Sequence, residues 1–338
     1  MQPYIRGGVL EYFAETAEQL GGDVPALLAG ADVAPEVLTL AGVFLPYANY
    51  LRLMHLAARQ TGTEHFGLLM ARSSNAETLG TIGITMTQAD TVGAAWETLA
   101  HFYRIHDTYG EVRMERQPDR VVISYGLPRY NQAGTRQVVD VAAGITCNIM
   151  RRLCGSGFEA TELAFPYRQP ADVAVFADLP CHQVSFGAKA MEVVVPEHYM
   201  RQKLASGAEE LQLVFDGYRG SHGASRRSLA RQVEDMIRRL MPTGTCTLPR
   251  VAATLATTPR TLQAKLEQEQ CSFRDILENV RKEIATFHLR RGDMQLTQLA
   301  MVLGYSELSA FSRSFRSWYG ESPRKWAQRQ QRPDEDNE

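Results

Sequence analysis

Two short helices joined by a tight turn are predicted by the stretch Leu296-Thr-Gln-Leu-Ala-Met-Val-Leu-Gly-Tyr-Ser-Glu-Leu-Ser-Ala-Phe-Ser-Arg-Ser-Phe-Arg316. Its first part places apolar residues on one side of a helix and then reaches Gly304, whose missing Cβ permits the positive φ of a turn. Ser306 can cap a second helix. Three aromatic residues at helical spacing then share one buried stripe, namely Phe311, Phe315 and Trp318. The pattern is that of a helix-turn-helix.

The second of these helices also has a polar face opposite its aromatic stripe. With Phe311 at 0° and about 100° per residue, this face lies at about 100° to 200°. It consists of Ser309, Ser312, Arg313 and Arg316. Such an outward face is typical of a recognition helix that enters the major groove of DNA. Leu308 is ambiguous, because it could contact a thymine methyl group or belong to the core.

The same pattern occurs once upstream, over residues 248–266. Its first-helix apolar positions repeat those of the later stretch at an offset of 48 residues, and its second-helix positions repeat at 49. Thr258-Pro259 is a strong helix start, because threonine caps free amides and proline lacks the amide that would have no partner. The outward positions are Arg260, Gln263, Ala264 and Glu267, of which Glu267 could be a repelled charge at the rim.

The tandem pattern resembles the DNA-binding domain of AraC/XylS-type transcription regulators. The resemblance covers about residues 229 to 330 and rests on Gly304-Tyr305, Phe311-Ser-Arg313, Phe315-Arg316 and Gly320-Glu-Ser-Pro323. It implies that one recognition helix enters each of two successive major grooves. Two departures occur, since Ala256 replaces the usual turn glycine and Ala264 stands where a long basic residue is frequent. The second departure suggests fewer polar base contacts from the first helix.

Side-chain chemistry divides the outward residues into base readers and phosphate contacts. Arg260, Gln263, Ser309 and Arg313 are the expected base-reading set, because arginine and glutamine form paired hydrogen bonds with guanine and adenine edges. Lys265 and Arg316 lie nearer the flanks and suit phosphate. The alternative for every one of these positions is an ordinary solvated helix face.

Length and charge predict two domains of different character. The chain has 338 residues, is 44% hydrophobic and 22% charged, and has a formal net charge of -2. Residues 225–332 hold 19 Lys and Arg against 10 Asp and Glu, whereas residues 1–224 hold 17 against 24. A basic half is expected for phosphate binding. We therefore predict a sensing and dimerisation domain (1–200), a linker (201–228), a DNA-binding domain (229–330) and an acidic tail (331–338).

Cysteine spacing and hydropathy exclude several other classes. None of the 5 cysteines forms a CxxC pair or has metal-ligand spacing, so reduced structural thiols are expected and neither a metal nor another cofactor is predicted. No apolar run reaches the ~18 residues of a membrane span, and the N-terminus lacks a signal-peptide core. A cytoplasmic protein without membrane contact is the expectation.

The N-terminal half predicts an α+β domain, with a helical lead-in and a mostly antiparallel sheet covered by helices. Helices are predicted at 8–20, 47–60, 91–106 and 136–153, and strands at 79–87 and 161–166. Two hairpins are predicted, 111–116 with 120–125 and 183–186 with 191–195. The C-terminal half is all-α, with a lead-in helix at 228–241 and a spacer helix at about 273–290 between the two motifs.

This half resembles the N-terminal ligand-binding domain of the arabinose-binding branch of the AraC family, over about residues 8 to 195. The resemblance rests on Leu79-Gly-Thr-Ile-Gly, the helix around Trp96 and residues 176–186. It implies a small-molecule effector but does not identify it as a sugar. Polar and aromatic residues that could line the pocket are Trp96, His101, Tyr103 and His106, although a structural role is the alternative for each.

The sequence favours a transcription regulator over an enzyme, since it contains no phosphate loop, nucleophile elbow, HExxH or paired-carboxylate pattern. The expected partners are double-stranded DNA, an effector, RNA polymerase and a second copy of the chain, and activation is expected because the resembled family mostly activates. Two alternatives stay open. One is a ligand-independent regulator whose N-terminal domain only dimerises, and the other is an enzyme domain fused to a DNA-binding domain.

Overall fold

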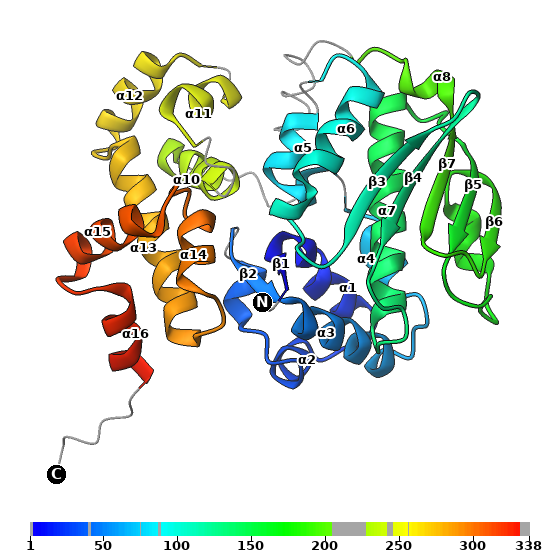
Figure 1. Cartoon of the computed structure of the whole chain (residues 1–338), viewed down its shortest axis with the longest axis horizontal. Coiled ribbons are helices and arrows are strands. Elements are labelled where there is room, and N and C mark those ends of the chain that lie inside the picture. Colours follow the sequence, from blue (N-terminus) through cyan, green and yellow to red (C-terminus); the bar gives the residue numbers. More distant parts are fainter. Residues whose placement is uncertain are drawn as a thin grey trace. The chain divides into compact units, whose positions relative to one another are not determined.

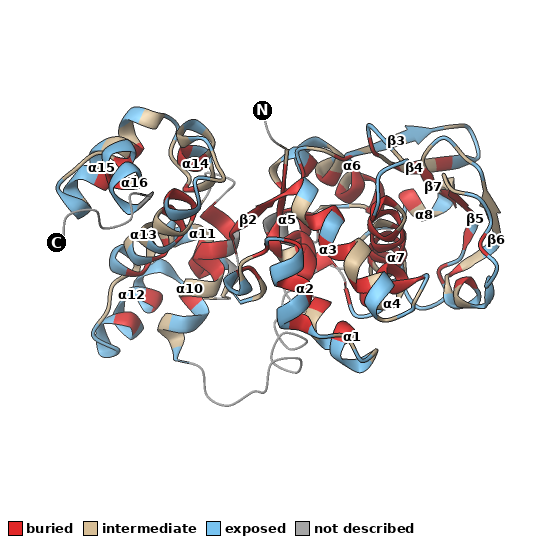
Figure 2. Cartoon of the chain, turned by 90° about the horizontal axis from the view of Figure 1, so that it is seen from below, coloured by how far each residue is buried: buried red, intermediate tan, exposed pale blue. Residues whose placement is uncertain are grey.

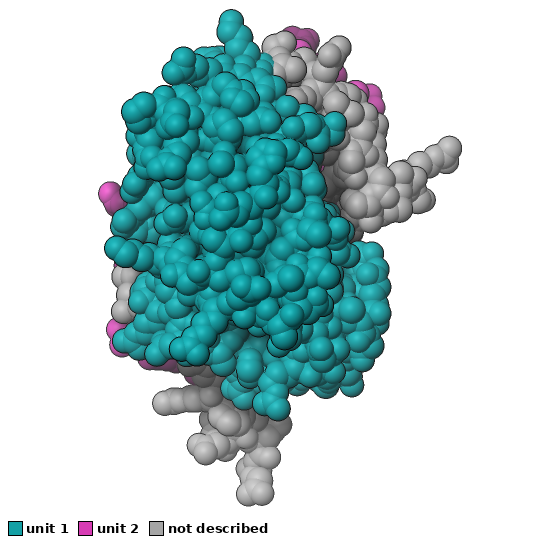
Figure 3. All heavy atoms as spheres, turned by 90° about the vertical axis from the view of Figure 1, so that its right-hand side faces the viewer, with its two compact units in different colours: residues 1–214 teal, residues 215–338 magenta. Residues whose placement is uncertain are grey.

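The computed structural model describes residues 3–39, 42–74, 76–86, 89–204, 228–241, 246–255 and 257–331. The chain divides into two compact units, Met1–Val214 and Phe215–Glu338 (Figure 1 and Figure 3). Most of the predicted linker, residues 205–227, and tail residues 332–338 lie outside the described residues. The start of the predicted linker packs on the first unit, where the Val92 amide donates to the Gln202 carbonyl at 3.0 Å and the Leu204 amide to that of Asp90 at 3.1 Å.

The first unit mixes helices and strands as predicted. In chain order, its elements are β1 (Tyr4–Arg6), η1 (Gly7–Leu10), α1 (Phe13–Gln19), α2 (Val24–Gly30), η2 (Pro35–Leu38), β2 (Phe44–Pro46), α3 (Tyr47–Gln60), α4 (Phe66–Ala71), η3 (Ala76–Leu79), α5 (Thr81–Met86), α6 (Val92–Phe102), η4 (Tyr103–Ile105), β3 (Glu111–Arg116), β4 (Arg120–Gly126), α7 (Thr135–Cys154), β5 (Ala160–Phe165), η5 (Ala174–Asp178), β6 (Cys181–Phe186), β7 (Met191–Pro196) and α8 (Glu197–Met200).

A five-stranded sheet forms the frame of this unit, in the order β3-β4-β7-β5-β6. Every neighbouring pair is antiparallel except β5 and β6, so the predicted mostly antiparallel sheet is confirmed. Val121, Ile123 and Tyr125 alternate with more exposed residues along β4 and are buried. Helix α6 packs against β3 and α7 against β7, and α7 is buried along most of its length (Figure 2). The core therefore lies between the sheet and these two helices.

The predicted strand at 79–87 is wrong, because the described part of this segment is helical. Residues 76–79 form η3 and residues 81–86 form α5. Ile82 and Met86, four residues apart, are both buried, which fits one helical face. Gly80 has φ +62°, and a Cβ on Gly83 would lie 1.7 Å from the Ala76 carbonyl oxygen. A short run of alternating apolar residues fits either period, and tight packing around two glycines favours the helical turn.

The second predicted hairpin is also wrong, although both of its strands exist. β5 lies between β6 and β7, and β6 pairs with β5 in parallel. The chain leaves β6 through Gly187, whose amide donates to the Tyr167 carbonyl at 3.0 Å, and Ala188, whose amide donates to that of Phe165 at 3.0 Å. These bonds hold the connection beside the end of β5. The first predicted hairpin, β3 with β4, is confirmed.

The second unit is entirely helical in its described part, as predicted. Its elements are α10 (Leu229–Leu240), α11 (Leu248–Thr254), α12 (Pro259–Gln268), α13 (Phe273–Arg291), α14 (Leu296–Val302), α15 (Leu308–Tyr319) and α16 (Pro323–Gln331). Leu262 and Leu266 of α12 and Phe311 and Phe315 of α15 are buried in equivalent positions. Trp318 is only half-buried, and the aromatic core is completed instead by Trp326 of α16.

Candidate functional site

The second helix-turn-helix consists of α14, a turn at Gly304, and α15. Gly304 has φ +73°, as its place in the sequence predicts, and a Cβ there would lie 2.8 Å from the carbonyl oxygen of Met241 at the end of α10. The Tyr305 amide closes the turn by donating to the Ala300 carbonyl at 2.9 Å. Only glycine combines this conformation with so close an approach, so the turn fixes where α15 begins.

The predicted cap of α15 is wrong by one residue. Glu307, and not Ser306, occupies the N-cap position, and α15 begins at Leu308. The Glu307 carboxylate accepts a hydrogen bond from the Ser309 hydroxyl at 2.9 Å. A carboxylate next to the first turn is compatible with the positive end of the helix dipole, although the Glu307 side chain makes no hydrogen bond to a backbone amide of this turn.

The first helix-turn-helix consists of α11, a short turn and α12. The Thr258 hydroxyl accepts from the Thr261 amide at 3.2 Å, and Pro259 is the first helical residue, so the predicted helix start is confirmed. At the other end of α12, the Glu269 carboxylate accepts from the amides of Leu229 at 2.9 Å and Ala230 at 2.8 Å. This carboxylate satisfies free amides at the start of α10 and thereby ties α12 to α10.

Helix α13 connects the two motifs through two arginines. Arg238 of α10 is buried and pairs with Glu283 of α13 and, at 2.7 Å, with Glu234 one turn away. Arg281 of α13 donates from Nε to the Leu303 carbonyl at 3.0 Å and lies 4.4 Å over the Tyr305 ring. No pattern in the sequence indicates these roles, because they depend on contacts between segments far apart in it. Together they hold α10 and the second turn on one rigid helix.

The predicted DNA-binding residues lie on the outward sides of α12 and α15. Those on α12 are all exposed, and those on α15 are exposed or half-buried: Arg260, Gln263, Ala264, Lys265, Ser309, Arg313 and Arg316 are exposed, and Leu308 and Ser312 are half-buried. Each helix also carries two cations for which the described residues provide no carboxylate within ion-pair distance, Arg260 and Lys265 on α12 and Arg313 and Arg316 on α15. Both helices thus present positive charge to solvent, although the cations occupy different positions along the two motifs.

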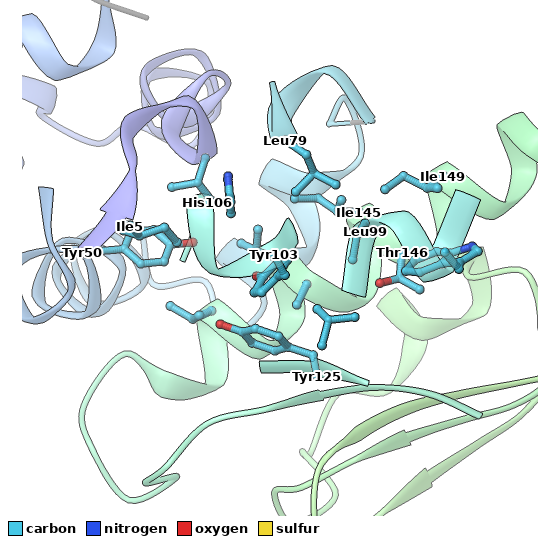
Figure 4. Close-up of a pocket in the computed structure, with 16 residues that line it drawn as sticks. Ile5, Tyr50, Leu79, Leu99, Tyr103, His106, Tyr125, Ile145, Thr146 and Ile149 are labelled. Carbon is cyan, nitrogen blue, oxygen red and sulfur yellow. The ribbon is translucent and has the colours of Figure 1, made fainter. Parts of the chain in front are cut away.

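A small cavity lies inside the first unit, bounded by α6, α7, β4 and the short segments β1 and η3 (Figure 4). Three of the four residues predicted to line a ligand pocket contribute to its wall, Trp96, Tyr103 and His106. His101 does not, because its side chain is exposed on the outer side of α6. Tyr50 and Tyr125 also line the cavity, and no sequence pattern indicates either residue because they lie on separate elements.

Next to the cavity lies a buried carboxylate, Asp107, with three hydrogen bonds. It accepts from the amides of Tyr109 at 2.7 Å and Gly110 at 2.9 Å, and from the hydroxyl of Tyr125 at 3.0 Å. Burial raises the pKa of Asp107 to about 6, although these hydrogen bonds oppose the shift. Burial, together with the charge of Arg6, lowers the pKa of His106 to about 3. His106 is therefore neutral at physiological pH.

Other kinds of site find no support in the described part of the chain. No group of three or more His, Cys, Asp or Glu side chains among these residues is arranged to hold a metal ion. No described helix is both long enough and apolar enough to cross a bilayer. Most residues predicted from the sequence to bind a partner thus lie either on the exposed faces of α12 and α15 or around the mainly apolar cavity of the first unit.

Both units match known protein families. Residues 21–204 match the family described as the arabinose-binding domain of AraC transcription regulators, N-terminal, and residues 251–329 match a helix-turn-helix domain family. The predicted resemblances are thereby confirmed in both halves of the chain.

Several relatives match the chain over nearly their whole length. The chain is 26% identical to the HTH-type transcriptional regulator VirS of Mycobacterium tuberculosis, over 95% of this chain and 96% of that protein. It is 23% identical to the ornithine utilization regulator of Pseudomonas aeruginosa, over 93% of each. The crystal structure of the transcriptional regulator CdpR from Pseudomonas aeruginosa is 20% identical, with 94% of this chain and 98% of that chain covered and a TM-score of 0.40. The chain is a transcription regulator with a helix-turn-helix DNA-binding region, and it belongs to the AraC family.

Proposed function

We propose that this regulator binds duplex DNA with α12 and α15 in two successive major grooves, and that a small effector bound by the first unit controls this binding. The main support for DNA binding is the pair of outward helix faces, each with two cations for which the described residues provide no carboxylate partner. Phosphate contacts by such cations supply sequence-independent affinity, and base-edge contacts by arginine and glutamine supply specificity.

The length of α13 supports simultaneous use of both helices. It has 19 residues, which at 1.5 Å each span about 28 Å, close to the ~34 Å repeat of the major groove. Because α13 is fixed to α10 by the Arg238–Glu283 ion pair and to the second turn by Arg281, the two motifs keep a defined separation. A fixed separation lets both helices meet one face of straight or gently bent DNA.

The two arginines of α15 differ in their expected roles. Arg313 lies one turn nearer the helix N-terminus, the end that reaches base edges in this docking mode, whereas Arg316 lies closer to the flank. We propose that Arg313 reads sequence and Arg316 contacts phosphate. On α12, Arg260 and Gln263 take the reading role and Lys265 the phosphate role.

Titration of the full-length protein with its operator and with random DNA tests this proposal. Arg313→Ala should cost about 1 to 3 kcal/mol on the operator and relax preference at one or two base pairs. Arg316→Ala should weaken both DNAs alike and reduce the slope of log affinity against log salt by about one. Arg52→Ala, an exposed arginine on α3 of the first unit, is the matched control and should change neither value.

Binding that is absent or independent of salt would contradict the proposed use of the basic faces. If Arg313→Ala leaves relative preference among single-base operator variants unchanged, the docking of α15 is wrong even though the family is right. A library of such variants, measured at two salt concentrations, separates these cases.

We further propose that the protein acts as a dimer through its first unit and activates transcription together with RNA polymerase. One monomer reads only a short asymmetric site, so pairing of two copies lengthens the recognised sequence. Light scattering of the full-length protein at micromolar concentration should give the mass of a dimer, and a monomer both with and without DNA would refute this. A reporter behind the operator should lose expression when the gene is deleted, and a gain would identify a repressor.

A further inference from the structure

The cavity of the first unit has two chemically different ends. Tyr50, His106 and Tyr125 gather at one end, and Leu99, Ile145 and Ile149 lie with Thr146 at the other, as the side chains in Figure 4 show. An apolar wall with a few polar groups at one side is typical of a small-molecule site, because burial supplies affinity and the polar groups fix orientation.

Two polar atoms at the first end have no hydrogen-bond partner among the residues that the structure describes. They are the Tyr50 hydroxyl and Nδ1 of His106, and both side chains are almost completely buried. Buried polar atoms nearly always have partners, since leaving one without a partner costs free energy. In contrast, the nearby Tyr125 hydroxyl is already used by Asp107 and Tyr47. Tyr50 and His106 are therefore the groups available to a bound molecule.

Charge around this end favours a neutral molecule. Asp107 lies near enough to raise the pKa of Tyr50, and the charge of Arg6 acts on His106. An ion of either sign placed here would be attracted by one of these two groups and repelled by the other, so neither sign has a net partner to offset the loss of its hydration. A hydroxyl can both donate and accept, so it can serve the Tyr50 hydroxyl and either tautomer of neutral His106.

The volume of the cavity limits the size of the molecule that it can hold. The cavity volume is ≈ 50 Å³, and one water needs about 10 to 15 Å³, so the cavity holds about four water-sized groups as it stands and a slightly longer chain only with small side-chain shifts. A sugar would also place several hydroxyls against the other end, where the lining side chains are mostly aliphatic and few of these hydroxyls would find partners.

We infer that this cavity takes a short, uncharged, mainly hydrocarbon alcohol, whose hydroxyl meets Tyr50 and His106 and whose chain lies against Leu99, Ile145 and Ile149. The identification of this molecule with the effector rests on the proposed function. The binding itself does not, because it follows from the cavity alone.

Ligand-observed NMR titration of the full-length protein tests the inference with 1-pentanol, pentanoate, pentylammonium and L-arabinose as probes. We expect saturable binding of 1-pentanol at millimolar concentration, as suits so few heavy atoms, and at least ten-fold weaker binding of the two ions and the sugar. Pentanoate or arabinose binding as tightly as 1-pentanol would overturn the assignment of the head group.

Two variants locate the site. Tyr50→Phe should weaken 1-pentanol about three- to ten-fold, the usual range for one hydrogen bond, without loss of thermal stability. Tyr199→Phe is its control, because the Tyr199 hydroxyl lies outside the cavity with contacts of 3.4 Å, and it should bind as the parent does. Ala142→Leu should fill the cavity and abolish binding. Equal binding by the parent and Tyr50→Phe would overturn the inference even if Ala142→Leu fails to fold.

DNA titrations of the same samples keep the two proposals apart. If none of the probes binds while operator binding is intact, the cavity inference fails and the DNA-binding proposal stands. If 1-pentanol binds as expected while operator binding is absent, the inference stands and the proposed function fails. A change in operator affinity on addition of 1-pentanol would support both.

Discussion

Replacing Gly304 by alanine probes the turn on which the position of α15 depends. At φ +73° an L-residue loses about 1 to 2 kcal/mol relative to glycine. The added Cβ would also lie 2.8 Å from the Met241 carbonyl oxygen, so α10 or α14 must shift, at a cost of about 1 to 3 kcal/mol for an overpacked contact. We therefore expect Gly304→Ala to destabilise the second unit by about 3 kcal/mol.

Gly320 provides a matched control at the end of α15. Its φ is +77°, nearly that of Gly304, but a Cβ there would have no neighbour within 4 Å. Gly320→Ala should therefore cost only the conformational part, about 1 to 2 kcal/mol. The difference between the two variants isolates the close contact of Gly304 with the end of α10.

Amide hydrogen exchange of peptides from α14 and α15 in the full-length protein measures both changes, because it reports the opening free energy of this region separately from the first unit. Equal losses in the two variants would refute the close-contact argument. If Gly320→Ala leaves the opening free energy of this region unchanged, the argument from backbone conformation is refuted. Gly304→Ala should also weaken operator binding at a temperature where the unit is still folded, since α15 would no longer begin at the same place.

Three further predictions concern buried groups. The low pKa of His106 makes stability fall as the pH drops from 6.5 toward 3, whereas the raised pKa of Asp107 makes stability fall as the pH rises from 3.8 to about 6. In His106→Phe only the Asp107 contribution should remain, so the free energy of unfolding should fall by about 1.4 kcal/mol per pH unit as the pH rises from 4 to 6. Thermal unfolding of the first unit that does not change with pH in this range would contradict this. Arg238→Ala should lower the opening free energy of α10 by about 2 kcal/mol, because its two carboxylate partners lose their cation. Unchanged hydrogen exchange of α10 would show that these ion pairs do not stabilise it. Trp326→Ala should destabilise the second unit by about 3 to 5 kcal/mol and lower operator affinity, since the centroids of the Trp326 and Phe315 rings lie 5.8 Å apart. A loss below about 1 kcal/mol in the opening free energy of α15, measured by hydrogen exchange, would show that Trp326 is not part of its core.

The predictions that succeeded rest on interactions within a few residues. Thr258-Pro259 starts α12 because a side-chain cap and a proline act on the adjacent turn, and Gly304 turns the chain because its own φ is positive. The apolar spacing of Phe311 and Phe315 likewise reports one helix face directly. Such signals are written in consecutive residues, so they predict the tandem helix-turn-helix and the outward position of Arg313.

The predictions that failed depend on competing contacts. Ser306 and Glu307 both suit the start of α15, and the sequence does not show which of the two takes the N-cap position. Residues 79–87 fit a strand or a helix until Gly83 is seen packed against Ala76. The proposed linker and tail boundaries stay predictions, since most of their residues lie outside the described part of the chain.

By itself, the sequence determined a helical, basic C-terminal unit with two helix-turn-helix motifs, because helix caps, turn glycines and apolar periodicity act locally. Tertiary structure decided that β5 separates β6 from β7, and that Tyr50, His106 and Tyr125 meet around one cavity. Strand order and cavities depend on the free energy of contacts between segments tens of residues apart. No spacing along the chain records those contacts, so only the folded unit brings Tyr50 and His106 to the same wall.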